Sequence, residues 1–401
     1  MDPVRNPYAP GAGQRPPELA GRDRELQAFE VVLERVARAR PERSIVLTGL
    51  RGVGKTVLLN TLRSQAISRL WGTGKIEARP DQQLRRPLAA ALHMAARELA
   101  PRHRAPDRVA AFLGVLKAFA LRSAGPDAKL RDRWQPGIDV PAATGRADSG
   151  DIEIDLVELL TDAAELAADV GTGIALFIDE MQDLGADDVS ALCAACHELS
   201  QSGAPLIVVG AGLPHLPVVL SAAKSYSERL FRYQRIDRLD REASDQALVA
   251  PAAREGVRYE EAALDALYEA SGGYPYFVQA YGKATWDHAP RSPITAADVR
   301  MARPAADAEL AVGFFGSRYE RATPAEREYL RTMASLAAAA GNDGDVAVPT
   351  AEVARALSRR PASLSPARDA LIKKGLIYSG ERGTVAFTVP HFGRYLRGQP
   401  L

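Results

Sequence analysis

The sequence lacks most features that mark export, membrane insertion or a disulfide scaffold. Only 2 of its 401 residues are cysteine, which excludes the disulfide frameworks of small secreted domains. Residues 1–17 are rich in Pro, Gly and Arg and lack the apolar stretch of a secretory signal. The longest apolar stretch, residues 206–220, is interrupted by Gly and Pro and is too short to span a bilayer. We therefore expect a cytoplasmic protein without a membrane segment.

The chain also lacks an excess of charge of either sign. Its 51 Lys and Arg against 50 Asp and Glu give a net charge of +1, so no field of the whole chain favours nucleic acid or membranes. A surface that binds nucleic acid or membranes must therefore be confined to one part of the chain. A length of 401 residues with 46% hydrophobic residues predicts two or three ordinary globular domains.

The two cysteines stand in the order Cys193-Ala-Ala-Cys196-His197, which matches the spacing of covalent haem attachment. That chemistry belongs to exported cytochromes, and this chain has no export signal. Leu192, Cys196 and Leu199 recur at helical spacing, as on a buried helix face. We expect packed cysteines rather than a haem site.

What the sequence does contain is a phosphate-binding loop. Residues 49–56 read GLRGVGKT and satisfy G-x-x-x-x-G-K-[ST], after the apolar run 44–48 and before a helix that begins at Lys55. The alternative, a plain Gly-rich turn, leaves a Lys-Thr pair at a helix start unexplained. Lys55 is expected to reach the β- and γ-phosphates of ATP, and Thr56 to bind Mg²⁺. The residues expected to contact the nucleotide here are Gly49, Leu50, Arg51, Gly52, Val53, Gly54, Lys55, Thr56 and Val57.

A second motif places two acids at the end of another apolar run. Residues 174–178 read IALFI and are followed by Asp179 and Glu180. Carboxylates at the carboxyl end of a parallel strand face a phosphate site, so Asp179 is predicted to bind Mg²⁺. Glu180 is predicted to polarise the attacking water, with Lys55 as a further catalytic group. The alternative is an acid pair favoured by a helix dipole.

Strand and helix patterns alternate through the first half of the chain. Strands at 44–48, 174–178 and 206–209, separated by amphipathic helices, predict an α/β fold with a parallel sheet in a three-layer P-loop core. Residues 123–150 are predicted to be a long mobile loop. The boundaries we expect are a disordered leader at 1–17, the ATPase core at 18–239, a helical lid at 240–322 and a third domain at 323–401.

The third domain begins at Thr323-Pro324-Ala325-Glu326, a capping box with Pro at the first helical position. Three helical patterns followed by a hairpin pattern predict a winged helix-turn-helix. Residues 351–401 hold nine basic residues against three acidic ones, which favours binding of DNA phosphates. The residues expected to contact DNA are Ser365, Arg368, Lys373 and Arg382. The alternative is a module that docks a protein partner, with solvated cations.

The two motifs, together with Gly21-Arg22 and Gly273-Tyr274-Pro275, resemble AAA+ ATPases of the origin-recognition and archaeal type, which grade into signal-transduction ATPases with numerous domains. The resemblance covers about residues 18–300. It implies that Arg22 borders the adenine and that Pro275 lies over the nucleotide from the lid. It also implies that Arg229 enters the ATP site of a neighbouring subunit in a homo-oligomer. The alternative for Arg229 is a surface side chain paired with Glu228 or Asp237.

Two departures from the family pattern bear on rate. The run Val209-Gly210-Ala211-Gly212 has no polar sensor residue, and residues 273–277 offer no lid arginine. We therefore expect ATP binding with slow or partner-stimulated hydrolysis. The function expected is a nucleotide-controlled, DNA-associated regulator or initiator-like ATPase; the alternative is a nucleotide-gated signalling switch that binds a protein partner.

Overall fold

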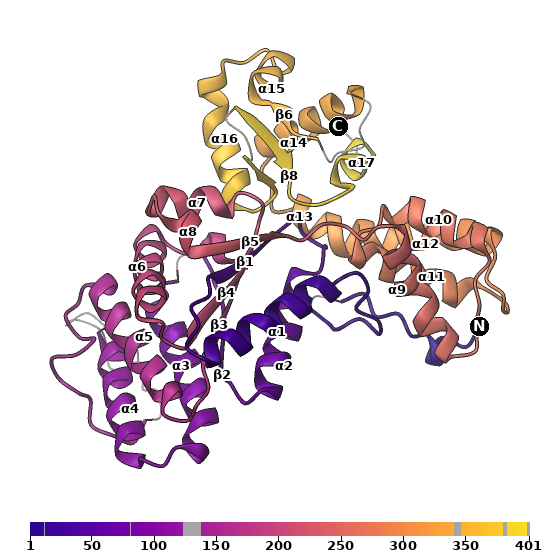
Figure 1. Cartoon of the computed structure of the whole chain (residues 1–401). Coiled ribbons are helices and arrows are strands. Elements are labelled where there is room, and N and C mark those ends of the chain that lie inside the picture. The colour runs from indigo at the N-terminus through magenta and orange to yellow at the C-terminus, as the bar shows by residue number, and fades with distance from the viewer. Residues whose placement is uncertain (12, 81, 123–137, 341–345, 380–382, 399–401) are drawn as a thin grey trace.

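The computed structural model describes residues 1–11, 13–80, 82–122, 138–340, 346–379 and 383–398. Figure 1 shows three parts: a core around one sheet, a group of helices beside it that we call the lid, and a C-terminal module above both. The lid comprises α9 to α13, and the C-terminal module comprises α14 to α17 with a small sheet. No helix in these ranges is both long and apolar enough to cross a bilayer.

The core sheet has five parallel strands in the order β2-β3-β4-β1-β5. Its strands are β1 (Ser44–Thr48), β2 (Gly72–Glu77), β3 (Ile174–Asp179), β4 (Leu206–Gly212) and β5 (Phe231–Arg235). The predicted parallel sheet is confirmed. However, β4 lies between β1 and β3, so the strand that carries the acid pair is not the direct neighbour of the strand that enters the phosphate loop.

Helices cover both faces of this sheet, which gives the predicted three layers (Figure 1). Alternation along β1 explains the two cores: Ile45 and Leu47 pack with α1 and α2, whereas Val46 packs with the helices on the opposite face. The core helices are α1 (Asp23–Ala37), α2 (Lys55–Ser68), α3 (Arg85–Leu99), α4 (Pro106–Leu121), α5 (Ile152–Ala168), α6 (Ala186–Ser202), α7 (Leu216–Ala223) and α8 (Ser227–Leu230), with short 3-10 turns at Ala100–Arg102 and Met181–Asp183.

Cys193 and Cys196 are both buried and free in α6, as packed cysteines should be. Burial raises the pKa of Cys193 to about 11 and that of Cys196 to about 12. Both thiols therefore stay protonated at neutral pH, as expected of packed cysteines.

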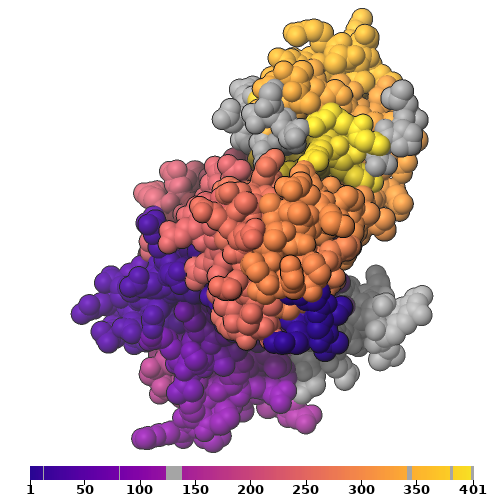
Figure 2. All heavy atoms as spheres, turned by 90° about the vertical axis from the view of Figure 1, so that its right-hand side faces the viewer, coloured from indigo at the N-terminus to yellow at the C-terminus, as the bar shows by residue number. Residues whose placement is uncertain are grey.

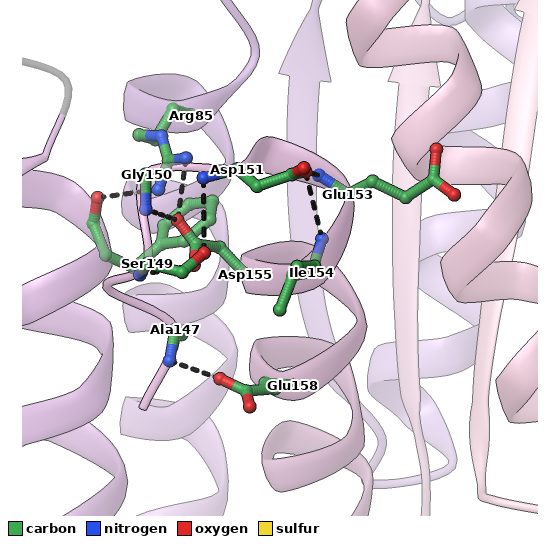
Figure 3. A network of polar contacts seen from close by, with 10 residues as sticks. Arg85, Ala147, Ser149, Gly150, Asp151, Glu153, Ile154, Asp155 and Glu158 are labelled. Carbon is green, nitrogen blue, oxygen red and sulfur yellow. Dashed lines mark hydrogen bonds and ion pairs between the residues drawn. The ribbon is translucent and has the colours of Figure 1, made fainter. Parts of the chain in front are cut away.

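The segment before α5 is pinned by a buried ion pair (Figure 3). The Asp155 carboxylate is fully buried and accepts hydrogen bonds from Arg85 Nη2 (2.9 Å), Ser149 Oγ (2.7 Å) and the backbone N–H groups of Ser149 and Gly150. Lys117 Nζ also donates to the carbonyls of Ile138 and Val140. Of the predicted mobile loop, residues 123–137 lie outside the described ranges, whereas residues 138–150 pack against the core. The prediction of mobility was therefore wrong for the latter part.

The lid consists of helices alone. Its elements are α9 (Arg241–Arg254), α10 (Glu261–Ser271), α11 (Pro275–His288), α12 (Ala296–Leu310), a π-helix at Ala311–Gly316 and α13 (Ser317–Tyr319). The π-helix continues α12 without a break, and it brings Phe314 and Phe315 into the middle of the molecule.

The N-terminal segment, residues 1–11 and 13–17, lies against this lid (Figure 2). Tyr8 is only 3% exposed, and its Oη donates to the Leu248 carbonyl at 2.7 Å. The ring of Tyr8 also packs edge-on against Trp286, whose Nε1 donates to the Asp2 carbonyl at 3.0 Å. The prediction of a disordered leader was therefore wrong. Although this segment is rich in Pro, Gly and Arg, the buried Tyr8 ring and a few backbone contacts hold it against the lid.

The C-terminal module combines helices with a three-stranded antiparallel sheet in the order β6-β8-β7. Its elements are α14 (Pro324–Ala339), β6 (Val348–Pro349), α15 (Thr350–Ala356), α16 (Pro361–Lys373), β7 (Ile377–Tyr378), β8 (Thr384–Phe387) and α17 (Phe392–Arg397). The predicted capping box of Thr323 and Glu326 is present, with Pro324 at the first helical position. The helices α14, α15 and α16 precede the β7–β8 pair, with β6 between α14 and α15. That this module is a winged helix stays a prediction.

Candidate nucleotide site

The phosphate loop joins β1 to α2 and needs glycine at two points for different reasons. A Cβ atom on Gly49 would lie 2.2 Å from the Ile236 carbonyl oxygen, so no side chain fits there. Gly54, directly before α2, has φ of 90°, in the left-handed region that L side chains rarely adopt. The loop backbone is therefore shaped by its glycines before any ligand arrives.

Lys55 lies at the first position of α2 and folds its side chain back into this loop. Its Nζ donates to the carbonyl oxygens of Gly49 and Leu50, each at 2.8 Å. Burial lowers the pKa of Lys55 to about 8, although the nearby Glu180 carboxylate opposes this shift. The ammonium is thus held inside the loop where phosphate oxygens would replace the two carbonyls.

Asp179 ends β3 and is buried beside Thr56. Burial raises the pKa of Asp179, while a hydrogen bond from the Thr56 hydroxyl lowers it. A hydroxyl next to a carboxylate fits Mg²⁺, which takes oxygen ligands and commonly keeps only one or two from protein. The described ranges contain no cluster of three or more His, Cys, Asp or Glu residues that could hold a metal ion.

Glu180 follows with φ of 49° and is held from two sides. Its Oε1 accepts from Arg51 Nη1 at 3.1 Å, and its Oε2 accepts from Gln182 Nε2 at 2.8 Å. The Gln182 side chain also accepts from the backbone N–H of Leu213 at 3.0 Å, just beyond β4. Gln182 therefore provides the polar contact at the end of β4 that the strand itself lacks.

A cavity of about 360 Å³ brings these groups together. It is bounded by the phosphate loop and both acids on the core side, and by Pro275, Tyr276 and Gln279 on the lid side. The N-terminal segment supplies a third wall, which the sequence did not predict. The residues of this wall are Ala9, Pro10, Gly11, Gly13, Gln14 and Pro16.

Arg318, on α13, is the cationic residue of this cavity that sequence reasoning missed. Its guanidinium stacks 4.3 Å from the centre of the Phe314 ring and donates to the Phe314 carbonyl. Burial lowers the pKa of Arg318, and the neighbouring charge of Arg51 lowers it further. The predicted absence of a lid arginine holds for residues 273–277, but α13 brings a guanidinium to the same cavity.

The residues expected to border the base line a smaller recess of about 50 Å³ next to the main cavity. Arg22 lies there with Val57 and Pro275, and its Nη2 donates to the carbonyls of Val53 (3.1 Å) and Asp237 (2.6 Å). Pro275 and Val57 line both spaces. Together the two spaces are lined by Arg22, Pro275 and residues 51–57, whereas Gly49 and Leu50 line neither.

Arg229 is placed differently. It lies exposed on α8 and does not line the cavity of its own chain. Its backbone N–H donates to the Tyr226 carbonyl at 3.0 Å, whereas its side chain makes no hydrogen bond or ion pair within the described ranges. Asp237, one of the partners considered for it, pairs instead with Arg235. Its role toward a neighbouring subunit stays a prediction.

Three of the four residues predicted to contact DNA lie along α16. Ser365 donates weakly to the Pro361 carbonyl, Arg368 pairs with the adjacent Asp369 at 3.0 Å, and Lys373 is exposed. Arg382, the fourth, lies outside the described residues. Two further cations of this module are paired: Arg359 with Glu328 and Lys374 with Glu326.

The C-terminal module contacts the phosphate loop directly. The backbone N–H of Arg51 donates to the Thr388 carbonyl at 2.9 Å, just beyond β8. Tyr378 of β7 stacks on His215, with ring centres 6.3 Å apart. Arg51 therefore links two parts of the protein: its backbone contacts the C-terminal module, and its side chain contacts Glu180.

Comparisons with known proteins bear on the domains and the fold. Residues 18–209 match the family model of the AAA ATPase domain, and residues 312–396 match a domain of unknown function, DUF8462. No curated protein matches the chain. The Walker-type ATPase PabY2304 of Pyrococcus abyssi is 16% identical with a TM-score of 0.60, over 96% of this chain and 97% of that one.

Two further solved structures align at lower similarity. The RuvB Holliday junction branch migration motor of Thermotoga maritima is 16% identical with a TM-score of 0.44, over 97% of this chain and 100% of that one. Cdc6p from Pyrobaculum aerophilum is 15% identical with a TM-score of 0.41, over 99% of this chain and 97% of that one. Residues 18–209 thus match an AAA ATPase domain, and the chain shares its fold with PabY2304.

Proposed function

We propose that this protein is a slow AAA+ ATPase whose nucleotide state controls the position of the C-terminal module, and that it acts as a DNA-associated regulator or initiator-like protein. The observation that carries the proposal is one cavity lined by Lys55, Thr56, Asp179 and Glu180 and roofed by the lid. A bound Mg²⁺ would neutralise phosphate charge and orient the γ-phosphate.

The chain's own residues divide the remaining work. Lys55 and the inward N–H groups of the loop bind the phosphates, and Thr56 with Asp179 would hold the metal. Glu180 would accept a proton from the attacking water, but in this state both of its oxygens are engaged by Arg51 and Gln182. These contacts compete with the attacking water for the carboxylate, which supports slow turnover.

The nucleotide-binding part is tested by Lys55→Ala, with affinity measured by calorimetry. Loss of the ammonium should weaken ATP binding by about 100-fold or more, since it contacts the phosphates with a full charge. Arg63→Ala on the same helix, outside the cavity, is the matched control and should bind as wild type. Wild-type affinity in Lys55→Ala would refute the phosphate-loop assignment.

The proposed binding of DNA depends on α16. The residues exposed along this helix include Pro361, Ser363, Pro366 and Lys373. Arg368→Ala combined with Lys373→Ala should weaken binding to duplex DNA at low salt by about tenfold and flatten its salt dependence. Arg300→Ala, an exposed lid arginine, controls for general charge loss. Absence of DNA binding at low salt would contradict the DNA role and favour the alternative, a nucleotide-gated switch whose module binds a protein partner.

A further inference from the structure

A second cavity, of about 260 Å³, lies between the lid and the C-terminal module and is separate from the nucleotide cavity. Five aromatic rings line it: Phe277 and Tyr281 from α11, Phe315 from the π-helix, Tyr395 from α17 and His391 just before α17. Phe277, Tyr281 and Phe315 are almost fully buried. Stacked or edge-on ring arrangements of this kind favour a flat, apolar ligand.

The charged groups of this cavity differ in whether they already have a partner. The Asp307 carboxylate is already engaged, because it accepts from the Tyr281 hydroxyl and lies 3.9 Å from Arg303 Nε. The Arg394 guanidinium also lines the cavity, but it makes no hydrogen bond or ion pair with any residue in the described ranges. Because the Arg394 guanidinium has no such partner and lies beside aromatic rings, this cavity suits an aromatic ligand with a negatively charged group.

The two cavities share an aromatic wall. Tyr276 and Phe314 face the nucleotide cavity, while the next residues in the chain, Phe277 and Phe315, face the second one. Tyr276 stacks on Phe314 with ring centres 4.6 Å apart, and Phe314 meets Phe315 edge-on at 5.3 Å. An occupant of the second cavity therefore touches the wall that bounds the nucleotide.

We propose that this cavity is a binding site for a small aromatic anion, with the rings holding its flat body and Arg394 binding its acidic group. The site is built jointly by the lid and the C-terminal module, so its ligand would bind the docked arrangement of the two. The proposal does not depend on ATP hydrolysis or on DNA binding.

The probe for the test is 8-anilino-1-naphthalenesulfonate, whose fluorescence rises in apolar surroundings; its uncharged relative N-phenyl-1-naphthylamine is the comparison. Titration of the full chain should give one saturable site for the sulfonate. Arg394→Gln should weaken sulfonate binding by about tenfold and leave the uncharged dye within twofold of wild type. Arg360→Gln, an exposed arginine elsewhere on the module, should change neither.

Two further variants locate the dye. Ala311→Phe fills the cavity from the π-helix and Ala270→Leu fills it from α10, so either should reduce binding of both dyes. Lys55→Ala, which impairs the nucleotide cavity, should leave sulfonate affinity within twofold. Circular dichroism and thermal melting confirm that each variant is folded before its affinity is interpreted.

Three results would overturn the proposal. The first is wild-type sulfonate affinity in Arg394→Gln. The second is loss of sulfonate binding in Lys55→Ala, which would place the dye in the nucleotide cavity. The third is binding that arises only in a chain ending at Gly398, which would assign the cavity to the chain's own residues 399–401.

Discussion

Two arginine–carboxylate pairs in this molecule have the same chemistry but differ in their exposure to solvent. Arg85 and Asp155 have side chains that are 8% and 0% exposed, and four hydrogen bonds satisfy the carboxylate. Arg51 and Glu180 are 28% and 27% exposed, and they line a cavity. A pair without alternative partners or water fixes structure, whereas a pair facing an open cavity is free to exchange partners when a ligand enters.

The largest effect that this contrast predicts is on stability. Asp155→Ala leaves the Arg85 guanidinium buried without its partner, so the free energy of unfolding should fall by about 3–5 kcal/mol. The measurement is urea denaturation followed by circular dichroism. Asp162→Ala on the same helix is the control, because Asp162 pairs with a more exposed Arg146, and its loss should cost about 1 kcal/mol or less. Equal losses in the two variants would contradict the contrast.

Next in size is the effect of removing the base. Glu180→Gln keeps the shape of the side chain but cannot accept the proton of the attacking water, so kcat should fall by about 100-fold while ATP still binds. Single-turnover hydrolysis with radiolabelled ATP measures the rate, and calorimetry measures the affinity. Asp183→Asn, an acid one turn further along and outside the cavity, provides the control. Unchanged turnover in Glu180→Gln would remove Glu180 from the mechanism.

Arg318 should have a smaller effect. Arg318→Gln removes a cation from the nucleotide cavity but leaves the loop intact, so we expect about a tenfold loss in kcat/KM for ATP. Arg321→Gln, three residues along and outside the cavity, is the matched control. A steady-state phosphate-release assay gives both values, and a wild-type kcat/KM would show that Arg318 serves only to hold Phe314.

The lowered pKa of Lys55 gives a pH dependence. Above about pH 8 the ligand-free protein loses the Lys55 proton, so ATP affinity should fall by up to tenfold per pH unit. The sign for stability is opposite: the unfolded chain keeps this proton longer, so the ligand-free fold gains stability between about pH 8 and 10.5. Calorimetry across this range tests the first point. Lys55→Arg, whose charge does not titrate there, should show a flat profile.

The smallest expected change is in Arg51→Gln. Because the Arg51–Glu180 pair is partly exposed, its loss should change the free energy of unfolding by less than about 1 kcal/mol. Freed from Arg51, Glu180 should become more available, and basal turnover should rise by about threefold. A loss of stability comparable with that of Asp155→Ala would erase the distinction between the two pairs.

The sequence predicted the elements whose pattern is local. β1, β3 and β4 are short, mainly apolar runs, and the two nucleotide motifs lie at the ends of β1 and β3. β2 was missed because it contains two glycines and a lysine; its Gly74 is required where a Cβ would lie 2.8 Å from Ala91. β5 was missed because it is an edge strand with exposed arginines.

The unpredicted part of the site comes from distant segments. Arg318 and the N-terminal wall reach the cavity through tertiary packing, and neither belongs to a motif that spacing could reveal. Gln182 stood within the recognised strand end, but its bridge to Leu213 depends on the side-by-side placement of β3 and β4. Similarly, Lys374 adds to the basic count of the C-terminal module in sequence, yet in space it neutralises the capping-box residue Glu326.

The N-terminal wall has a consequence for exchange kinetics. Tyr8 attaches this segment to the lid, while Gly13 passes so close to Thr56 that an added Cβ would lie 3.2 Å from its methyl group. Separation of the lid and this N-terminal segment from the core would therefore speed the release of a bound nucleotide. Proteolytic cleavage between Tyr8 and Gly13 would separate the wall residues near Thr56 from their attachment to the lid. The residence time of the nucleotide should then shorten, although every phosphate contact is kept.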